Sequence, residues 1–243
     1  MVQLYNDDCF AIMEQLIKDK VTVDAIIADI PYNIKQDEWD KNFSIHFAVA
    51  MCNKLIKPNG NILFFQGYSN VCETKLLMDK YWTMQDWIIY DRIKGRGGRK
   101  HLVSTREDIL WYSNGDDYTF NKIPSNIKKK TTTGLGKKNG CEYRALSNVW
   151  TDISPLVPWS KEKVNHPTQK PIQLMDRLVK VFTNEGDVVL DFTMGSGSTG
   201  VSCIQNNRNF IGIELNKEYF EIAEQRIRMA LNEKGVEFYN LGD

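Results

Sequence analysis

The sequence predicts an α/β fold in which helices flank a mostly parallel central sheet. Short runs of β-branched and aromatic residues alternate with amphipathic stretches, which is typical of strand–helix–strand units. A glycine-rich turn follows one of these runs, as expected where an open α/β sheet binds a ligand at the carboxyl ends of its strands. Since 243 residues can bury a full core, we expect a large domain that carries an insertion.

The expected strands are apolar runs bounded by turn residues, and the expected helices carry apolar residues at helical spacing. The strands are residues 25–28, 62–66, 87–90, 109–112, 188–191 and 210–214. The helices are residues 9–19, 44–56, 70–80, 171–182, 198–206 and 217–232. The helix that begins near Pro171 has the clearest apolar stripe, which we assign to the core.

Composition excludes several protein classes. With 42% hydrophobic and 26% charged residues, the chain resembles ordinary globular proteins, and no run reaches the ~20 apolar residues of a membrane helix. The N-terminal residues lack the basic flank and apolar stretch of a secretory signal, so we expect a cytoplasmic protein without membrane association. The five cysteines are widely spaced and form no zinc pattern, which predicts reduced, mostly buried thiols and no bound metal.

Positive charge is concentrated in one segment, although the formal net charge is zero. Residues 92–144 contain 13 Lys and Arg against 5 acids, and the remainder of the chain is correspondingly acidic. In the same region the apolar pattern decays into glycine-rich and lysine-rich stretches, which predicts an insertion with mobile loops around a strand near Ile109. A polyanion-binding face and a solvated loop without a partner both explain this block.

The sequence around Gly195 predicts a nucleoside-binding turn. Gly195 and Gly197 follow the strand at 188–191, and Glu214 ends the next strand, 19 residues after Gly195. An acid at this distance is placed to bond ribose hydroxyls. Because Gly200 completes a Gly-x-Gly-x-x-Gly pattern, a nicotinamide cofactor remains an alternative at this point.

A candidate catalytic turn, Asp29-Ile30-Pro31-Tyr32, directly follows the strand at 25–28. The amino nitrogen of a nucleobase is a poor nucleophile because its lone pair is delocalised into the ring. The Asp29 carboxylate and the Ile30 carbonyl could accept its two hydrogens, while Tyr32 stacks on a flipped base. Pro31 would stiffen the turn. An ordinary strand end with an aspartate turn is the alternative.

Together these motifs resemble the β-class of S-adenosylmethionine-dependent DNA amino-methyltransferases, in which the catalytic motif precedes the cofactor glycines. Residues 29–32 resemble the Asp-Pro-Pro-Tyr motif, and residues 191–199 resemble the Asp-Pro-Phe-x-Gly-Ser-Gly-Thr-Thr loop. Residues 166–171 match His-Pro-Thr-Gln-Lys-Pro in full, and residues 6–9 resemble the N-terminal turn that contacts the adenine of the cofactor. The resemblance covers about residues 2–91 and 145–232.

The resemblance implies a Rossmann-like methyltransferase fold with a circularly permuted motif order. Residues 1–91 would form the catalytic half, residues 92–148 an inserted target-recognition region, and residues 149–243 the cofactor half. His166, Thr168 and Lys170 would hold the methionine part of S-adenosylmethionine. The full set of expected cofactor contacts is Asp8, Cys9, Asp29, His166, Thr168, Lys170, Asp191, Thr193, Gly195, Ser196, Gly197, Ser198, Thr199 and Glu214.

Two departures from the family pattern bear on function. Ile30 replaces a proline, but a backbone carbonyl is available from any residue, so we expect activity to survive. Phe192 and Thr193 stand where the family has Pro-Phe, so an aromatic interaction with the cofactor is lost or displaced by one position. This second change is expected to affect cofactor affinity.

The expected activity is methyl transfer to adenine N6 in double-stranded DNA, because Asp at the first motif position is more usual in the family's adenine enzymes. A cytosine-N4 methyltransferase, a nicotinamide-dependent oxidoreductase and a catalytically silent DNA-binding relative are the alternatives. Lys128, Lys129 and Lys130 are expected on phosphates, and Arg96 or Arg99 on bases. A homodimer and a cognate restriction endonuclease are possible partners from the family alone.

Overall fold

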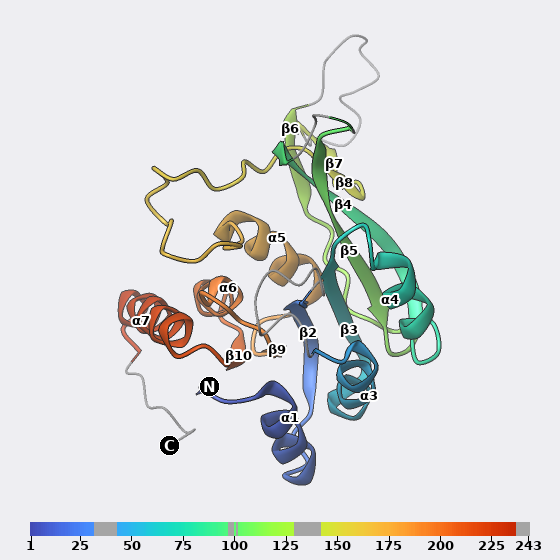
Figure 1. Ribbon diagram of the computed structural model, residues 1–243, viewed down its shortest axis with the longest axis vertical. Coiled ribbons are helices and arrows are strands. Elements are labelled where there is room, and N and C mark those ends of the chain that lie inside the picture. Colours follow the sequence, from blue (N-terminus) through green and yellow to red (C-terminus); the bar gives the residue numbers. More distant parts are fainter. Residues whose placement is uncertain (32–42, 97–99, 101, 129–141, 237–243) are drawn as a thin grey trace.

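The computed structural model describes residues 1–31, 43–96, 100, 102–128 and 142–236. Within these residues one eight-stranded sheet runs through the molecule in the order β1-β10-β9-β2-β3-β5-β4-β8 (Figure 1). Its strands are β1 (Val2–Tyr5), β2 (Val23–Asp29), β3 (Ile56–Gln66), β4 (Thr83–Arg96), β5 (Ser104–Ser113), β8 (Val149–Trp150), β9 (Val188–Asp191) and β10 (Asn209–Ile213). A separate two-stranded sheet pairs β6 (Pro124–Lys128) with β7 (Tyr143–Ala145).

The large sheet is mostly parallel, as the sequence predicts. Strands β1, β10, β9, β2 and β3 all run in the same direction, and only β5 is antiparallel to both of its neighbours, β3 and β4. Strand β2 lies centrally, with Ile26 opposite Leu190 of β9 and opposite Ile62 of β3. The carboxyl ends of β2, β9 and β10 therefore meet at one edge, where α/β sheets bind ligands.

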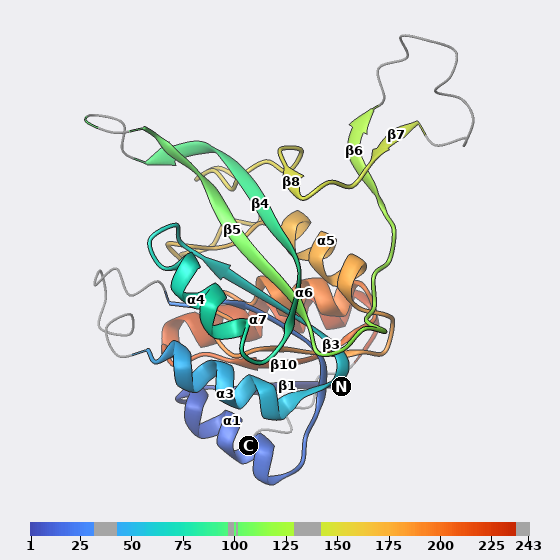
Figure 2. The ribbon, with the colours of Figure 1, turned by 90° about the vertical axis from the view of Figure 1, so that its right-hand side faces the viewer.

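Helices cover both faces of the sheet (Figures 1 and 2). Helices α1 (Cys9–Lys18), α3 (Ile45–Leu55) and α4 (Val71–Met78) share a core with Ile26 and Ala28. Helices α5 (Ile172–Phe182), α6 (Ser198–Gln205) and α7 (Lys217–Glu233) share a second core with Ala25 and Ile27. Because successive side chains of β2 enter opposite cores, the strand reads as a continuous apolar run.

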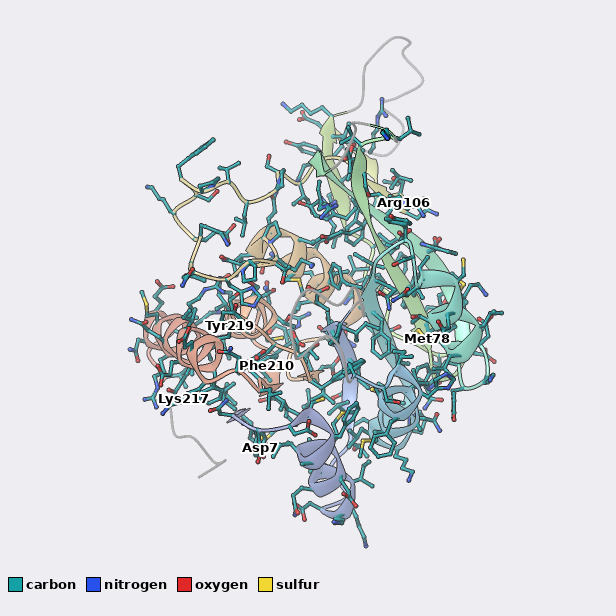
Figure 3. The ribbon with its side chains drawn as sticks, viewed as in Figure 1. Asp7, Met78, Arg106, Phe210, Lys217 and Tyr219 are labelled. Atoms are coloured by element: carbon teal, nitrogen blue, oxygen red, sulfur yellow. The ribbon has the colours of Figure 1, made fainter. Side chains whose placement is uncertain are left out.

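Close packing between these layers fixes the position of the sheet edge. Phe210 of β10 and Met78 of α4, which Figure 3 labels on the two sides of the molecule, are both fully buried.

None of the helices in the described part of the chain has the length and apolar character needed to cross a membrane. The described cysteines are free thiols, and Cys72 on α4 is exposed rather than buried.

Part of the segment expected to be an insertion, residues 92–148, contributes to the main sheet. The expected boundary at residue 92 falls inside β4, and β5 lies between β3 and β4 in the sheet. Strands β6 and β7 lie outside it and are tied to α5 through Asp152. This carboxylate accepts two bonds from Arg177, at 2.7 and 2.8 Å, and one from the backbone N–H of Asn126 at 2.7 Å.

Candidate active site

A cavity of about 560 Å³ opens at the carboxyl ends of β2, β9 and β10. It brings together segments that are far apart in the sequence: the start of α1, the end of β2, the turn before α5, the loop after β9 and the start of α7. The lining residues are Asp8, Cys9, Phe10, Asp29, Pro31, Phe43, His166, Thr168, Phe192, Thr193, Gly195, Ile213, Glu214, Leu215, Asn216 and Tyr219. Half of these are residues that the sequence predicts as cofactor contacts.

Glu214 holds the glycine-rich loop at the cavity wall. Its Oε2 accepts a hydrogen bond from the Gly195 N–H at 2.9 Å, and its Oε1 accepts one from the Asn216 N–H at 2.8 Å. Burial raises the pKa of this carboxyl, and the backbone bonds oppose the rise. Gly195 has φ of 51°, and a Cβ there would lie 2.8 Å from Nε2 of His166, so any other residue would be strained and would displace the imidazole.

Asp191 lies behind the cavity wall and connects the loop to helix α6. Its Oδ2 accepts from the Thr199 hydroxyl at 2.5 Å, and its Oδ1 accepts from the Thr193 N–H at 3.1 Å. Burial raises the pKa of Asp191 to about 7, although both hydrogen bonds favour the charged form. Within the described part of the chain, neither Asp191 nor Thr199 lines the cavity. Both residues therefore support the loop from the protein interior.

The other loop residues also face the protein interior. The Ser198 hydroxyl donates to the Lys170 carbonyl at 2.9 Å, and the Arg226 guanidinium donates to the Ser196 carbonyl. Gly197 has φ of 75°, and a Cβ there would lie 2.9 Å from the Ala223 side chain on α7. These contacts fix the loop to the turn before α5 and to α7, while Phe192, Thr193 and Gly195 line the cavity.

Aromatic rings form one wall of the cavity. The rings of Phe43 and Phe192 are nearly parallel, with centroids 6.3 Å apart and an interplanar angle of 2°. Phe10 stacks on Phe43, with ring centroids 5.4 Å apart. Phe192 also packs edge-on against Phe64 at 5.7 Å. The displaced motif aromatic thus still contributes to the wall. Phe10 and Phe43 are additional rings that the sequence motifs do not indicate.

The start of α1 forms another edge of the cavity. Asp8 caps this helix, because its Oδ1 accepts from the backbone N–H groups of Phe10 at 2.9 Å and Ala11 at 3.1 Å. The neighbouring Cys9 thiol has its pKa raised to about 12, first by burial and then by the Asp8 charge. A thiol with this pKa stays protonated at neutral pH and is a poor nucleophile.

The turn before α5 is held by hydrogen bonds and places His166 beside Gly195 of the glycine loop. Gln169 holds the turn closed: its Oε1 accepts from the Val164 N–H at 2.9 Å and its Nε2 donates to the Glu162 carbonyl at 2.7 Å. His166 packs edge-on against Tyr219 at 4.4 Å. Burial lowers the pKa of His166 to about 4, so the imidazole is neutral at neutral pH. Thr168 lines the cavity and does not cap α5, whose N-cap is Pro171.

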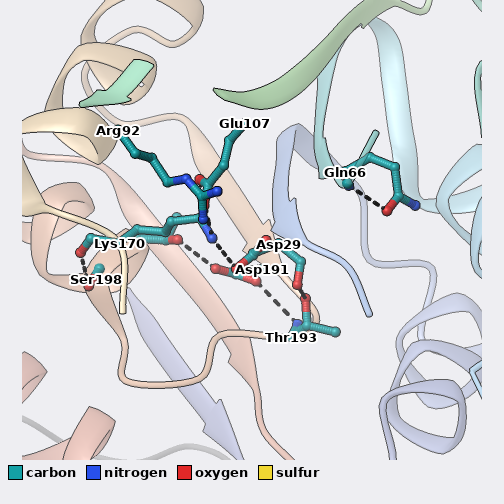
Figure 4. Close-up of polar contacts among 10 residues, drawn as sticks. Asp29, Gln66, Arg92, Glu107, Lys170, Asp191, Thr193 and Ser198 are labelled. Carbon is teal, nitrogen blue, oxygen red and sulfur yellow. Dashed lines mark hydrogen bonds and ion pairs between the residues drawn. The ribbon is translucent and has the colours of Figure 1, made fainter. Parts of the chain in front are cut away.

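Asp29 ends β2 at the cavity wall (Figure 4). Its Oδ2 is 2.5 Å from the Lys170 ammonium, and its backbone carbonyl accepts from the Thr193 hydroxyl at 3.3 Å. Ile30 is buried in the core, 1% exposed as a residue, and does not line the cavity among the described residues, so contact of its carbonyl with a base stays a prediction. Pro31 lines the cavity, and Tyr32 lies outside the described residues.

The residues expected to contact DNA lie mostly outside the described part of the chain. Lys128 is exposed at the end of β6. Arg96 ends β4, but its side chain is not among those described, and Arg99, Lys129 and Lys130 lie outside the described ranges. Their DNA contacts therefore stay predictions.

Several cavity residues are not predicted by the sequence motifs. They have in common that they follow or flank a motif: Phe10 follows Asp8 and Cys9, while Leu215, Asn216 and Tyr219 follow Glu214. Asn216 carries a recognisable signal, since its side chain caps α7 by accepting from the Tyr219 N–H at 3.1 Å. Phe43 carries none, because only the tertiary fold brings it opposite Phe192.

Comparisons with known proteins show which family this chain is similar to. A model of the DNA methylase family of N6 and N4 methyltransferases matches residues 23–225. The chain is 32% identical over 229 residues to the DNA adenine methyltransferase YhdJ of Escherichia coli, covering 86% of this chain and 77% of the relative. It is 30% identical over 251 residues to the type II methyltransferase M1.MboII of Moraxella bovis, covering 91% and 94%. The M1.HpyAVI–SAM crystal structure superposes with a TM-score of 0.70 at 30% identity, covering 93% of this chain and all of that one.

Proposed function

The chain belongs to the DNA methylase family of N6 and N4 methyltransferases, and we propose that it transfers a methyl group from S-adenosylmethionine to the N6 amino group of adenine in DNA. The observation that carries this proposal is the position of Asp29. This carboxylate lies at the end of the central strand, in the wall of the same cavity that Glu214, Gly195 and the aromatic rings enclose.

The residues around the cavity fit S-adenosylmethionine. Glu214 lies where ribose hydroxyls would bond to its carboxylate, and the Phe10, Phe43 and Phe192 rings offer an apolar wall for the adenine. The neutral His166 adds no positive charge next to a sulfonium, while Asp29 and Glu214 are acids. When bound, S-adenosylmethionine supplies a methyl group on a positively charged sulfur.

The protein's contribution to the reaction is to orient the acceptor. With the base flipped into the cavity, Asp29 accepts one hydrogen of the amino group and the Ile30 carbonyl accepts the other. These contacts favour a pyramidal nitrogen whose lone pair points at the methyl group. Tyr32 stacks on the base, and this stacking contributes about 1 to 3 kcal/mol. Positioning supplies most of the rate gain, since the transfer needs no covalent intermediate with the protein.

We propose adenine rather than cytosine as the target base for two reasons. The first motif residue is an aspartate, Asp29, and the chain is similar to a DNA adenine methyltransferase. The chemistry of Asp29 itself is compatible with either amino group, so cytosine N4 is the second candidate. A nicotinamide-dependent oxidoreductase no longer fits, because the chain is a DNA methylase and Gly200, the third glycine of that pattern, serves packing. A Cβ at Gly200 would lie 2.5 Å from Ile227 and 2.7 Å from Phe210.

Mass spectrometry of nucleosides tests the choice of base. Purified protein is incubated with S-adenosylmethionine and unmethylated genomic DNA, which is then digested to nucleosides. We expect N6-methyladenine and no N4-methylcytosine, with a reaction that lacks the protein as the blank. Appearance of N4-methylcytosine alone would refute adenine as the target, and no methylated nucleoside above the blank would favour a catalytically silent relative.

Partners beyond DNA stay predictions from the family. A homodimer would be measured as a doubled molar mass by light scattering at micromolar protein concentration. A cognate restriction endonuclease would cleave the unmethylated DNA and leave the methylated product intact. Mapping of the methylated bases by sequencing would give the recognition sequence.

A further inference from the structure

Lys170 lies between two carboxylates behind the cavity wall (Figure 4). Its ammonium is 2.5 Å from Asp29 Oδ2 and 3.5 Å from Glu107 Oε2, and it lies over the Phe65 ring at 5.2 Å from the centroid. An ammonium has three N–H donors, and these three neighbours lie around it. Among the described residues, Asp29 lines the cavity and Lys170 does not.

We propose that Lys170 is a positioning residue that fixes the orientation of the Asp29 carboxylate for methyl transfer, and that Glu107 holds Lys170 in place. This inference rests on the proposed role of Asp29 in orienting the target amino group. It differs from the role that the family resemblance gives to Lys170, a contact with the methionine part of the cofactor. The two roles predict different kinetic behaviour.

The main chain of Lys170 is already held on both sides. Gln169, directly before it, is bonded to Val164 and Glu162, and the Lys170 carbonyl accepts the Ser198 hydroxyl at 2.9 Å. Only the direction of the side chain is left to be determined, and Asp29 and Glu107 determine it. The bond from Lys170 to Oδ2 then limits the rotation of the Asp29 carboxylate.

Glu107 is suited to anchor this lysine. Its side chain is 12% exposed. Its Oε2 atom is buried and lies 3.5 Å from the Lys170 ammonium. Its Oε1 is 3.3 Å from Nη1 of Arg92, which lies near the end of β4. Burial alone would lower the pKa of Lys170, but the charges of Asp29 and Glu107 outweigh burial and raise it. The lysine therefore keeps its charge.

A buried ion pair of this kind is poor evidence for a role in stability, because desolvation cancels much of the attraction. Its location indicates function instead. Three ion pairs in series, from Arg92 to Glu107, from Glu107 to Lys170 and from Lys170 to Asp29, connect the strand pair β4–β5 with the cavity wall. Strand β5 thus contributes to the site through Glu107, although none of its residues lines the cavity in the described part of the chain.

Two substitutions separate positioning from cofactor binding. Lys170→Met removes the ammonium and keeps an unbranched side chain that is one atom shorter, and Glu107→Gln removes the charge of Glu107 and keeps the shape of its side chain. We expect Lys170→Met to lower the single-turnover rate at saturating cofactor and DNA by about 100-fold, as for a misplaced catalytic group. Glu107→Gln should lower it by about 10-fold, since the direct bond to Asp29 remains. The calorimetric Kd for S-adenosylmethionine should stay within about 3-fold of wild type in both, a difference below 1 kcal/mol.

Lys75→Met is the control, because Lys75 pairs with Asp79 at 2.7 Å within α4 and its continuation and does not line the cavity among the described residues. It should leave both rate and Kd unchanged. Thermal unfolding checks that each variant folds, and the double variant Lys170→Met with Glu107→Gln replaces the single one if an unpaired Glu107 prevents folding.

Each contrary result has one meaning. A Lys170→Met protein that binds the cofactor weakly, yet transfers methyl groups at the normal rate once saturated, would overturn positioning in favour of cofactor binding. An unchanged rate and Kd would overturn any role in the reaction. Asp29→Ala is measured in parallel: if it is active, the proposed function itself fails, whereas an inactive Asp29→Ala beside a fully active Lys170→Met refutes only the inference about Lys170.

Discussion

The acids at the carboxyl ends of β2, β9 and β10 have different environments, and these environments separate their roles. Asp29 lines the cavity and has a lysine beside it, while Glu214 accepts backbone bonds from Gly195 of the cofactor loop and from Asn216 at the start of α7. Asp191 is buried, 3% exposed, and its bonds within the described residues are to neutral groups, the Thr199 hydroxyl and the Thr193 N–H. The buried acid should therefore influence stability, and the two cavity acids should influence function.

Asp191→Asn should remove a pH dependence of stability. The pKa of Asp191 is raised from 3.8 to about 7, so between these values the folded protein holds a proton that the unfolded chain has lost. Stability from this group is present below pH 3.8 and is lost as the pH rises through 7. We expect the unfolding free energy of the variant to gain on wild type by up to about 4 kcal/mol over this range. Urea titrations from pH 4 to 8 measure it; a difference independent of pH would contradict the assignment.

Glu214→Gln should weaken cofactor binding without affecting DNA binding. The variant loses charge-assisted bonds to the Gly195 N–H and the expected bonds to the ribose hydroxyls. We expect the calorimetric Kd for S-adenosylmethionine to rise by about 10- to 100-fold, from a loss of roughly 1.5 to 3 kcal/mol. Glu218→Gln, at an exposed position on the first turn of α7, is the control. Equal affinities in the two variants would remove Glu214 from the cofactor site.

At the scale of elements, local patterns determine what can be predicted. The apolar stripe at 171–182 predicts a helix, and α5 begins within one residue of the expected start. The parallel strands β2 and β9 are predictable because both of their faces are buried, which gives continuous apolar runs. Strands β1 and β8 are not expected from the sequence. They have four and two residues, and their pairing with β10 and β4 depends on distant segments rather than on local sequence.

The same limit applies to the candidate site. Motif residues such as Asp29, Gly195 and Glu214 are predictable because their chemistry and spacing are visible in the sequence, and all three line the cavity. Phe43 and Glu107 are not, because a ring or an acid has no distinctive local pattern. Their roles come from the fold, which places Phe43 against Phe192 and Glu107 against Lys170.

Gly200→Ala tests the packing of α6 against its neighbours. Alanine normally favours a helix, but here its Cβ would lie 2.5 Å from Ile227 and 2.7 Å from Phe210. Overpacking of this kind costs about 1 to 3 kcal/mol, so we expect a net loss of unfolding free energy in urea. Gln205→Ala, at an exposed position of the same helix, should change it by less than about 0.5 kcal/mol. A Gly200→Ala protein more stable than wild type would contradict the packing role.

For the whole molecule, the concentration of positive charge in residues 92–144 is the feature most directly related to DNA. Replacing Lys128, Lys129 and Lys130 by alanine should weaken binding to all DNA sequences alike. The slope of log K against log salt should become less steep by about 0.9 for each phosphate that the variant no longer neutralises. Fluorescence anisotropy at several salt concentrations measures this slope.

The control for the lysines is a second triple variant with the same loss of charge. Lys18, Lys54 and Lys234 are exposed on α1, α3 and at the end of α7. Their replacement by alanine should leave the slope unchanged. If the two triple variants behave alike, the effect comes from net charge, and the proposed phosphate contacts are wrong.

The central claim is that Asp29 orients the amino group of the target base in a cavity that also binds the cofactor. Methyl transfer by Asp29→Ala, measured in a single turnover with tritiated S-adenosylmethionine and with cofactor binding confirmed by calorimetry, tests this claim most directly. We predict that the variant still binds the cofactor and transfers no detectable methyl group to DNA. Transfer at a near-normal rate by the cofactor-bound variant would contradict the account.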